Sequence, residues 1–328
     1  MILININVQA ANDTIPENVL LNQRSIGGWY KNIGIGYTKI LSVAEKAALT
    51  DDKSRNDATI DNNATNAEIR YLARLYKETG NREYLTSAEN GIRYLLKAQY
   101  KNGGWPQFYP DVSIYRSQIT YNDNAMINTM NVLNDVALRV NNLDVIDASL
   151  VGPSANAVKK GIDCILKTQI KVNGKLTAWC AQYDHSTMKP AKARAFELIS
   201  LSGDESEAIV TFLMKIKQPS IEIKNAINSA MEWFDIVKIS GYKFTSVPDA
   251  TQPKGRDKVV LPDPASVIWA RFYDIETNQP FFCGRDGIKK KTVAEIESER
   301  TNGYARYGNW PEILIKKKYP DWLKIYHS

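Results

Sequence analysis

The strongest constraint on the fold of this chain is a phrase that recurs at nearly constant spacing. A Leu-Leu pair, a glutamine and a Gly-Gly-Trp ending occur at 20–29 and again at 95–105, and a weaker copy occupies 165–179. The tryptophans that close the copies are 76 and 74 residues apart. A period of about 75 residues with two helical stretches is typical of stacked helical hairpins. We therefore expect three hairpins that close on each other.

Apolar residues at helical spacing indicate three pairs of helices. The ranges expected to be helical are 67–79, 84–99, 124–139, 154–168, 205–216 and 221–237. Residues 241–308 contain many Pro, Gly, Asp and aromatic residues without a long helical pattern, so we expect loops that shape a site. A final helix is expected at 313–324, with a break at Pro320. The predicted fold class is mainly α with little sheet.

Composition is that of an ordinary globular protein, with 44% hydrophobic and 24% charged residues in 328. At this length we expect one large or two modest domains. No apolar run is long enough for a membrane helix, and the first residues lack the features of a signal peptide. If the natural protein is exported, we expect this start to be a boundary within a longer sequence.

The net charge of +6 mildly favours an anionic partner, but it does not choose among nucleic acid, acidic polysaccharide and membrane surface. No nucleic-acid motif accompanies the charge. Histidine is scarce, because the chain contains only His185 and His327. A histidine metal site is therefore nearly excluded, and catalysis must depend on carboxylates, Arg, Lys or Tyr. The three cysteines form no metal motif, and buried free thiols are expected at Cys164, Cys180 and Cys283.

Two Asp-Asn pairs, at Asp61 and Asp123, each precede a predicted helix. Either aspartate could be a helix N-cap, a metal ligand or a member of an acid and base pair. The neighbouring asparagines add neutral oxygen donors. Hard oxygen ligands without His or Cys favour calcium over zinc.

Basic and aromatic residues suggest how an anionic ligand would be bound. Lys192 and Arg194 lie among small residues and could form a pocket for carboxylates, or an exposed basic loop. Arg285 could supply a second guanidinium, or pair structurally with the neighbouring Asp286. The aromatic loop that begins at Trp105 could be a sugar platform, or it could close the end of a helical barrel.

Several phrases together resemble the pectate lyases of polysaccharide lyase family 10. The resemblance extends from about Leu20 to Trp322, with the motifs in the same order. The phrases are DNNAT (61–65), AQYKNGGWPQFYP (98–110), ITYNDNAM (119–126), WCAQYD (179–184), KARAFE (192–197), SLSGDES (200–206), WARFYDIETNQPFFCGRDG (269–287) and EIESERTNGYARYG (295–308).

The resemblance implies an incomplete (α/α)3 toroid whose groove binds polygalacturonate and calcium. It also implies a single pectate lyase catalytic domain over 1–328, in which 1–17 are peripheral or foreign to the natural protein. It implies that Arg194 is the base and that Arg285 holds a substrate carboxylate. It also places Asp61 and Asp123 around the metal and Asn62 against the substrate. We add Lys192 and Trp105 as substrate-binding candidates. The chain departs from the family at Asn124, where a second acid is common, at Asn63, where Gly is common, and at Arg306, which replaces an aromatic.

These assignments suit β-elimination of a uronate polymer, in which removal of the C5 proton adds charge to an anion. Calcium would offset that charge. An arginine base needs high pH, because its pKa is normally above about 12. The expected enzyme is a secreted monomer that binds neither membrane nor nucleic acid. Two other interpretations stay open: a glycoside hydrolase that uses Asp61 and Asp123, and a module that binds anionic polysaccharide without cutting it.

Overall fold

The computed structural model describes residues 14–31, 36–252 and 254–326. The chain forms two compact units, Met1–Asp163 and Cys164–Ser328, which are described separately. The single catalytic domain expected over 1–328 stays a prediction. Most of the stretch 1–17 that was expected to be peripheral lies outside the described residues.

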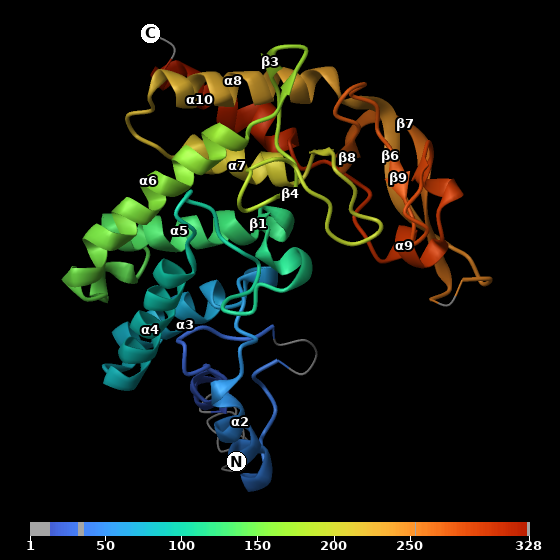
Figure 1. Ribbon diagram of the computed structural model, residues 1–328. Coiled ribbons are helices and arrows are strands. Elements are labelled where there is room, and N and C mark those ends of the chain that lie inside the picture. Colours follow the sequence, from blue (N-terminus) through green and yellow to red (C-terminus); the bar gives the residue numbers. More distant parts are fainter. Residues whose placement is uncertain (1–13, 32–35, 253, 327–328) are drawn as a thin grey trace, which may run out of the picture. The chain divides into compact units, whose positions relative to one another are not determined.

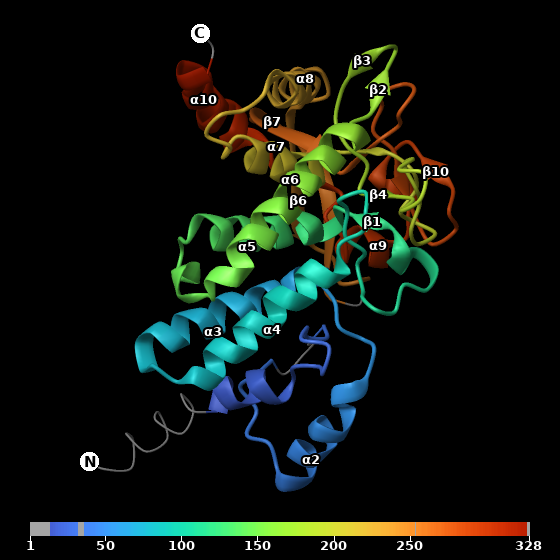
Figure 2. The ribbon, with the colours of Figure 1, turned by 60° about the vertical axis from the view of Figure 1, so that its left-hand side comes forward.

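The first unit is built from helices (Figure 1). After a helix over residues 14–21, its α-helices are α2 (Val43–Asp51), α3 (Asn66–Thr79), α4 (Arg82–Ala98), α5 (Ala125–Leu138) and α6 (Val151–Thr168), the last of which continues into the second unit. The strand β1 (Ile119–Thr120) and short 3-10 helices lie in the connections; the latter are η1 (Asp52–Ser54), η2 (Asp61–Asn63), η3 (Ile114–Ser117), η4 (Asn122–Asn124), η5 (Leu143–Val145) and η6 (Ala148–Leu150). Helices α3 and α4 lie side by side as a hairpin, as Figures 1 and 2 both show.

The recurring tryptophans have the same structural role in each copy. Trp29, Trp105 and Trp179 are fully buried, and each indole N–H donates to a carbonyl of the preceding helical segment at 2.7–2.8 Å. Trp269 makes the same bond to Phe234, at 2.8 Å, although the sequence analysis did not include it in the repeat. Each bond satisfies a carbonyl near the end of a helix, where no intrahelical backbone N–H is available.

The recurring glutamines join neighbouring segments. The Nε2 of Gln23 donates to a carbonyl of its own loop and to that of Ser87 in α4, and Gln99 bonds its loop and Ala157 in α6. Gln169 donates to Thr177 and to Ala226 at 2.8 and 2.9 Å. Because each glutamine satisfies two carbonyls at once, the three form equivalent cross-links between helices.

The first glycine of each strong Gly-Gly-Trp copy permits a close backbone approach. Gly27 and Gly103 have φ values of +103° and +94°. A Cβ at Gly27 would lie 2.4 Å from the Asn90 carbonyl oxygen, and one at Gly103 would lie 2.0 Å from that of Lys160. Both positions therefore require glycine, which explains the repeated phrase.

The second unit combines helices with small sheets. Its helices are α7 (Glu205–Leu213), α8 (Ile221–Ile236), η7 (Val293–Glu295), α9 (Ser298–Asn302), a π-helix (Leu314–Lys318) and α10 (Tyr319–Tyr326). Short strands pair as β2 (Lys171–Val172) with β3 (Lys175–Leu176), β5 (Leu201–Ser202) with β8 (Phe272–Tyr273), and β9 (Phe282–Cys283) with β10 (Lys289–Lys290), while β4 (Gln182–Tyr183) precedes the loop that carries Arg194.

A long hairpin lies within the stretch that was expected to form loops. Strands β6 (Ile239–Pro248) and β7 (Arg256–Ala270) pair antiparallel, and β11 (Tyr307–Gly308) joins β7. The pairing shifts between Ser240 and Tyr242, where Gly241 has a φ of +83°. Pro262 and Pro264 within β7 obscure the alternating pattern of a strand, so the hairpin was missed.

The six predicted helices are all present, with bounds that differ by a few residues, and the mainly helical fold class with little sheet is confirmed. The break expected at Pro320 is wrong: residues 312–326 are helical without interruption, and Pro320 lies in the first turn of α10, directly after the π-helix. None of the helices in the described ranges is long and apolar enough to span a membrane.

We expect Gln169→Ala to lower the free energy of unfolding by about 1–3 kcal/mol, because two buried carbonyls lose their donor. Chemical denaturation would measure the loss. Gln279→Ala is the matched control, since that side chain is exposed and should change stability by less than about 0.5 kcal/mol. Equal effects of the two substitutions would contradict the cross-linking role.

Candidate active site

The two Asp-Asn pairs form sharp turns rather than helix caps. The N-cap positions of α3 and α5 are held by Thr65 and Asn124, and neither side chain makes a capping hydrogen bond. Asn62 and Asn63 in the first turn, like Asp123 and Asn124 in the second, have φ between 48° and 65°. Asn and Asp are the non-glycine residues that best tolerate this left-handed region. The N-cap interpretation of Asp61 and Asp123 is therefore wrong.

The two turns are equivalent, but the structure matches Asp61 with Asn122, whereas the sequence analysis matched it with Asp123. Asp61 and Asn122 occupy the first, buried position of their 3-10 turns. Asn62 and Asp123 occupy the second, exposed position, with φ of 48° and 52°. The first turn thus buries its carboxylate, and the second presents it to solvent. The two turns contact each other within the first unit.

The buried carboxylate of Asp61 has one free oxygen. Its Oδ2 pairs with the Lys31 ammonium at 2.6 Å, while its Oδ1 is buried without a hydrogen-bond partner among the described residues. An oxygen of this kind suits a hard cation, and the amide oxygens of Asn62 and the carboxylate of Asp123 are donors of the same class. No group of three His, Cys, Asp or Glu side chains that could hold a metal occurs in the described part of the chain, so a cation here would need amide or substrate oxygens as well.

Trp105 cannot be a sugar platform, because its side chain is fully buried and its indole is bonded to Leu95. This substrate-binding prediction is wrong. The packing of the hairpins, which local sequence does not reveal, takes the tryptophan into the core. Phe108 is instead half-buried, with the Arg116 guanidinium 4.5 Å from its ring centre.

Arg194 and Arg285 lie on two loops of the same construction in the second unit. In each loop an aspartate, Asp184 or Asp274, follows a buried tyrosine and accepts hydrogen bonds from the next residues and from a threonine hydroxyl. Each loop also has one non-glycine residue in the left-handed region, Met188 at +57° and Asn278 at +55°. Their backbone hydrogen bonds also match, because the aspartate N–H donates to the carbonyl oxygen of the residue five positions later, at 2.9 Å in both loops. The pattern Trp-x3-Tyr-Asp-x2-Thr-x2-Pro, at 179–190 and 269–280, was the signal for this duplication.

Arg194 is held by a buried glutamate. Its backbone N–H and its Nε both donate to Oε2 of Glu197, at 3.2 and 2.8 Å, and its second guanidinium nitrogen bonds Oε1. The Tyr304 hydroxyl donates to the same Oε1 at 3.1 Å. Burial alone would raise the pKa of Glu197, but the hydrogen bonds and charge of Arg194 outweigh burial and hold that pKa below its usual value.

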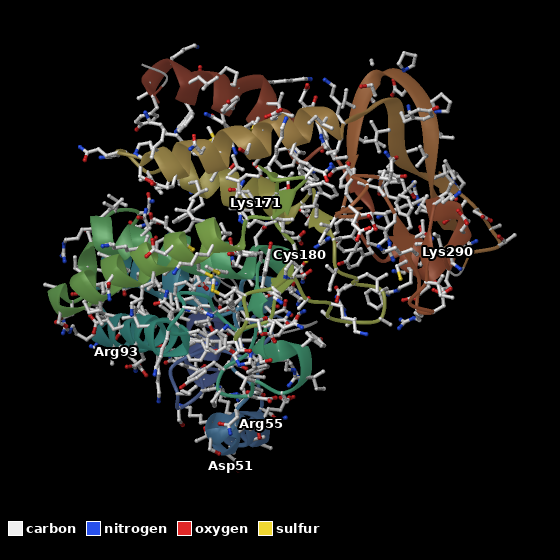
Figure 3. The ribbon with its side chains drawn as sticks, turned by 45° about the horizontal axis from the view of Figure 1, so that its top comes forward. Asp51, Arg55, Arg93, Lys171, Cys180 and Lys290 are labelled. Carbon is white, nitrogen blue, oxygen red and sulfur yellow. The ribbon has the colours of Figure 1, made fainter. Side chains whose placement is uncertain are left out.

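Arg285 is exposed and pairs with an exposed acid. Its Nε and second guanidinium nitrogen lie 3.1 and 3.2 Å from the Glu299 carboxylate, and its backbone N–H donates to Glu297. The alternative of a structural pair with Asp286 is not the arrangement observed, since Asp286 pairs with Lys290. Lys290, labelled in Figure 3, marks the strand β10 that follows the Arg285 loop. Lys192 is exposed on the Arg194 loop.

A line of ring and charge contacts joins the two arginines. The guanidinium carbons of Arg194 and Arg300 each lie 4.8 Å from the centre of the Phe196 ring. Arg300 in turn bonds Glu299, the partner of Arg285. Arg194 and Arg285 therefore belong to one cluster on the second unit.

Beneath this cluster lies a buried charged layer that the sequence analysis did not identify. Arg271 pairs with Glu205, both nearly fully buried, and its guanidinium carbon lies 4.6 Å from the Tyr304 ring centre. Arg306 contacts the same ring at 4.9 Å, and burial lowers its pKa. Glu197, Arg300 and Tyr304 were within phrases used for the family resemblance, but no role was assigned to them.

All three cysteines are free and buried, as predicted. The Cys283 thiol contacts the Ala195 carbonyl at 3.7 Å and so ties the two arginine loops together. Burial raises the pKa of the Cys180 thiol, the cysteine labelled in Figure 3. Buried thiols of this kind are poorly suited to nucleophilic chemistry.

Comparisons with known proteins agree on one relationship. Residues 23–315 match the family model described as pectic acid lyase. The chain is similar to the solved family 10 polysaccharide lyase from Cellvibrio cellulosa, with 35% identity, a TM-score of 0.80 and coverage of 93% of this chain and 90% of that one. An aspartate-to-alanine mutant of the same lyase, in complex with trigalacturonic acid, gives 34% identity, a TM-score of 0.82 and coverage of 95% and 96%. No curated protein sequence matches.

We expect Asp123→Ser to lower the free energy of unfolding by about 1 kcal/mol, because Asp123 has a φ of 52°, a left-handed conformation that aspartate and asparagine tolerate and serine does not. At an N-cap, serine would replace aspartate without loss. Urea denaturation distinguishes the two. Asp123→Asn is the control, since asparagine tolerates the same φ, and an Asp123→Ser variant as stable as this control would contradict the turn.

Proposed function

Because the chain belongs to the pectic acid lyase family and is therefore a polysaccharide lyase, we propose that it is a calcium-dependent pectate lyase that cleaves α-1,4-polygalacturonate by β-elimination. The trigalacturonic acid bound by the similar Cellvibrio lyase supports this choice of substrate. The observation that carries the proposal most directly is the pair of arginines on duplicated loops, because a uronate lyase needs one group to hold the carboxylate and one to take the adjacent proton.

Arg285 is the carboxylate-binding group in this proposal. Its side chain is 62% exposed and is paired with an acid that is also exposed, Glu299, at 55%. A substrate carboxylate can replace Glu299 with the same two-pronged geometry. Lys192 on the neighbouring loop adds positive charge. Asn62, exposed on its turn in the first unit, is kept as a substrate-binding candidate through its amide.

Arg194 is the base. Its side chain is 44% exposed while that of its partner Glu197 is 8% exposed, so the arginine can be reached from solvent. In the neutral form it removes the C5 proton; the electron pair forms the C4–C5 double bond, and the C4–O4 bond breaks. The leaving oxygen takes a proton from water. An alkaline optimum follows, because the neutral guanidine becomes common only at high pH.

Asp61 and Asp123 would hold the calcium, together with amide oxygens of their turns. The unpartnered Oδ1 of Asp61 and the exposed carboxylate of Asp123 fit this hard cation. When bound, calcium supplies positive charge that offsets the negative charge developing on the substrate. The Lys31 ammonium pairs with Oδ2 of Asp61 and also supplies positive charge there.

The remaining functional predictions accord with this substrate. Polygalacturonate is an extracellular polymer, so we propose that the enzyme is secreted, and we keep the prediction that it acts as a monomer. A glycoside hydrolase would give a saturated product, and a binding module would give none. Ultraviolet absorbance of an unsaturated product during incubation with polygalacturonate tests the proposal against both.

Removal of calcium should abolish product formation, and adding calcium back should restore it. The same ion should raise the melting temperature of the wild-type protein, because it binds the folded state, and Asp123→Ala should lose most of this shift. Magnesium at equal concentration is the control for ionic strength. Full activity in the presence of excess chelator would contradict the proposed dependence on calcium.

Arg194→Lys should lose most of kcat while substrate binding largely survives, because lysine cannot place a planar guanidinium nitrogen beside C5. Arg285→Lys should mainly raise KM, because its bonds to the carboxylate exist in both ground and transition states. Steady-state kinetics with a defined oligogalacturonate compares the two. A normal kcat for Arg194→Lys removes Arg194 from the base position.

A further inference from the structure

The duplicated loops hold their two arginines in different ways. In both, a glutamate accepts the arginine backbone N–H: Glu197 for Arg194 and Glu297 for Arg285. Glu197 also bonds the guanidinium of Arg194. In the second loop, the contacts of the described residues show the Arg285 guanidinium bonded to a different acid, Glu299. The Glu197 side chain is 8% exposed, whereas Glu299, the partner of the Arg285 guanidinium, is 55% exposed. Substrate can therefore displace Glu299 easily but cannot easily displace Glu197.

The Glu197 carboxylate that holds Arg194 is itself held in place by neighbouring side chains. Tyr304 donates its hydroxyl to Oε1 of Glu197, and its ring packs edge-on against Phe196 with centres 6.1 Å apart. Phe196, beside Glu197 in sequence, lies against the Arg194 guanidinium. The carboxylate is thus fixed from one side by a hydroxyl and the guanidinium is fixed by both the carboxylate and a ring.

Two other cationic groups lie near Arg194, and their charge opposes the stabilisation of its protonated form by the Glu197 carboxylate. Lys192 lies on the same loop, and Arg300 comes from α9 to the same Phe196 ring. Repulsion from Arg194 opposes the effect of Glu299, which raises the pKa of Arg300. The loop that packs on the Ala195 carbonyl brings the neutral Cys283 thiol and, a few residues on, Asp286. Glu197 is the carboxylate that directly bonds the Arg194 guanidinium.

We propose that Glu197, anchored by Tyr304, is the positioning residue of the base: it fixes the plane of the Arg194 guanidinium and sets the pH at which this arginine can accept a proton. The inference rests on the proposed base role of Arg194. A carboxylate in contact stabilises the protonated guanidinium, so it moves loss of the proton to higher pH. Glu197 therefore holds the Arg194 guanidinium in a fixed orientation. It also lowers the fraction of neutral Arg194, and so the activity, near neutral pH.

The test is the pH dependence of kcat/KM for polygalacturonate cleavage with calcium present. Glu197→Gln keeps hydrogen-bonding atoms but removes the charge, so the acid limb of the profile should move to lower pH by about one unit or more. The maximal rate should fall, because an amide holds the guanidinium less rigidly. Glu197→Asp keeps the charge, so its limb should stay at the wild-type pH while kcat falls.

Tyr304→Phe is the second variant. Without the hydroxyl, the Glu197 carboxylate has one donor fewer and pairs more strongly with Arg194, so the limb should move slightly to higher pH and never to lower pH. Glu312→Gln is the matched control, since this carboxylate bonds Lys316 and Asn309 and should leave the profile unchanged. Circular dichroism checks that each variant is folded.

The outcomes separate this inference from the proposed function. Absence of an absorbing product with the wild-type enzyme, or a normal kcat for Arg194→Lys, contradicts the proposed function. If both of those tests succeed and Glu197→Gln is folded but slower with an unmoved limb, Glu197 is only structural and the inference is wrong. If Glu197→Gln does not fold, an unmoved limb in Tyr304→Phe overturns the inference.

Discussion

The fold depends on hydrogen bonds that side chains make to the ends of neighbouring helices. Helix ends leave carbonyls without intrahelical donors, and buried carbonyls need partners. Buried tryptophans and glutamines supply those donors at equivalent places, with Gln169 joining Thr177 and Ala226 as one instance. Gly27 and Gly103 let the backbone approach closely enough for these bonds to form. The loops that follow each tryptophan therefore start from fixed points, and they carry the functional side chains.

The same principle extends to the chemistry of the second unit. The loops behind Trp179 and Trp269 fold alike, and each ends at an arginine. The difference between the two arginines lies in their acids, one buried and one exposed. In our proposal this difference separates a base that must not move from a binding group that must exchange partners, so burial of one carboxylate distinguishes the two roles.

The helical hairpins could be predicted because apolar periodicity and the repeated phrase act locally. The sequence could not exclude that Asp61 and Asp123 are helix N-caps, because a carboxylate just before a helix is typical of a cap. The left-handed residues of the two turns, which show otherwise, are known only from the structure. Trp105 was misplaced because burial follows from packing of distant segments. The β6–β7 hairpin was hidden by prolines. Arg194 and Arg285 came from family resemblance, whereas Glu197, visible in the same phrase, gained a role only from its distances to Arg194.

The duplicated loops also differ in length by one position, since Arg194 is the tenth residue after Asp184 and Arg285 is the eleventh after Asp274. Arg194 lies in a bend and Arg285 in a turn, so a shift of one residue along this curved backbone changes the direction in which the side chain leaves it. Such an offset explains how two copies of one loop can direct their guanidinium groups to different acids. A single insertion or deletion, rather than a substitution, would then be the shortest evolutionary route from two equivalent arginines to a division of labour between them.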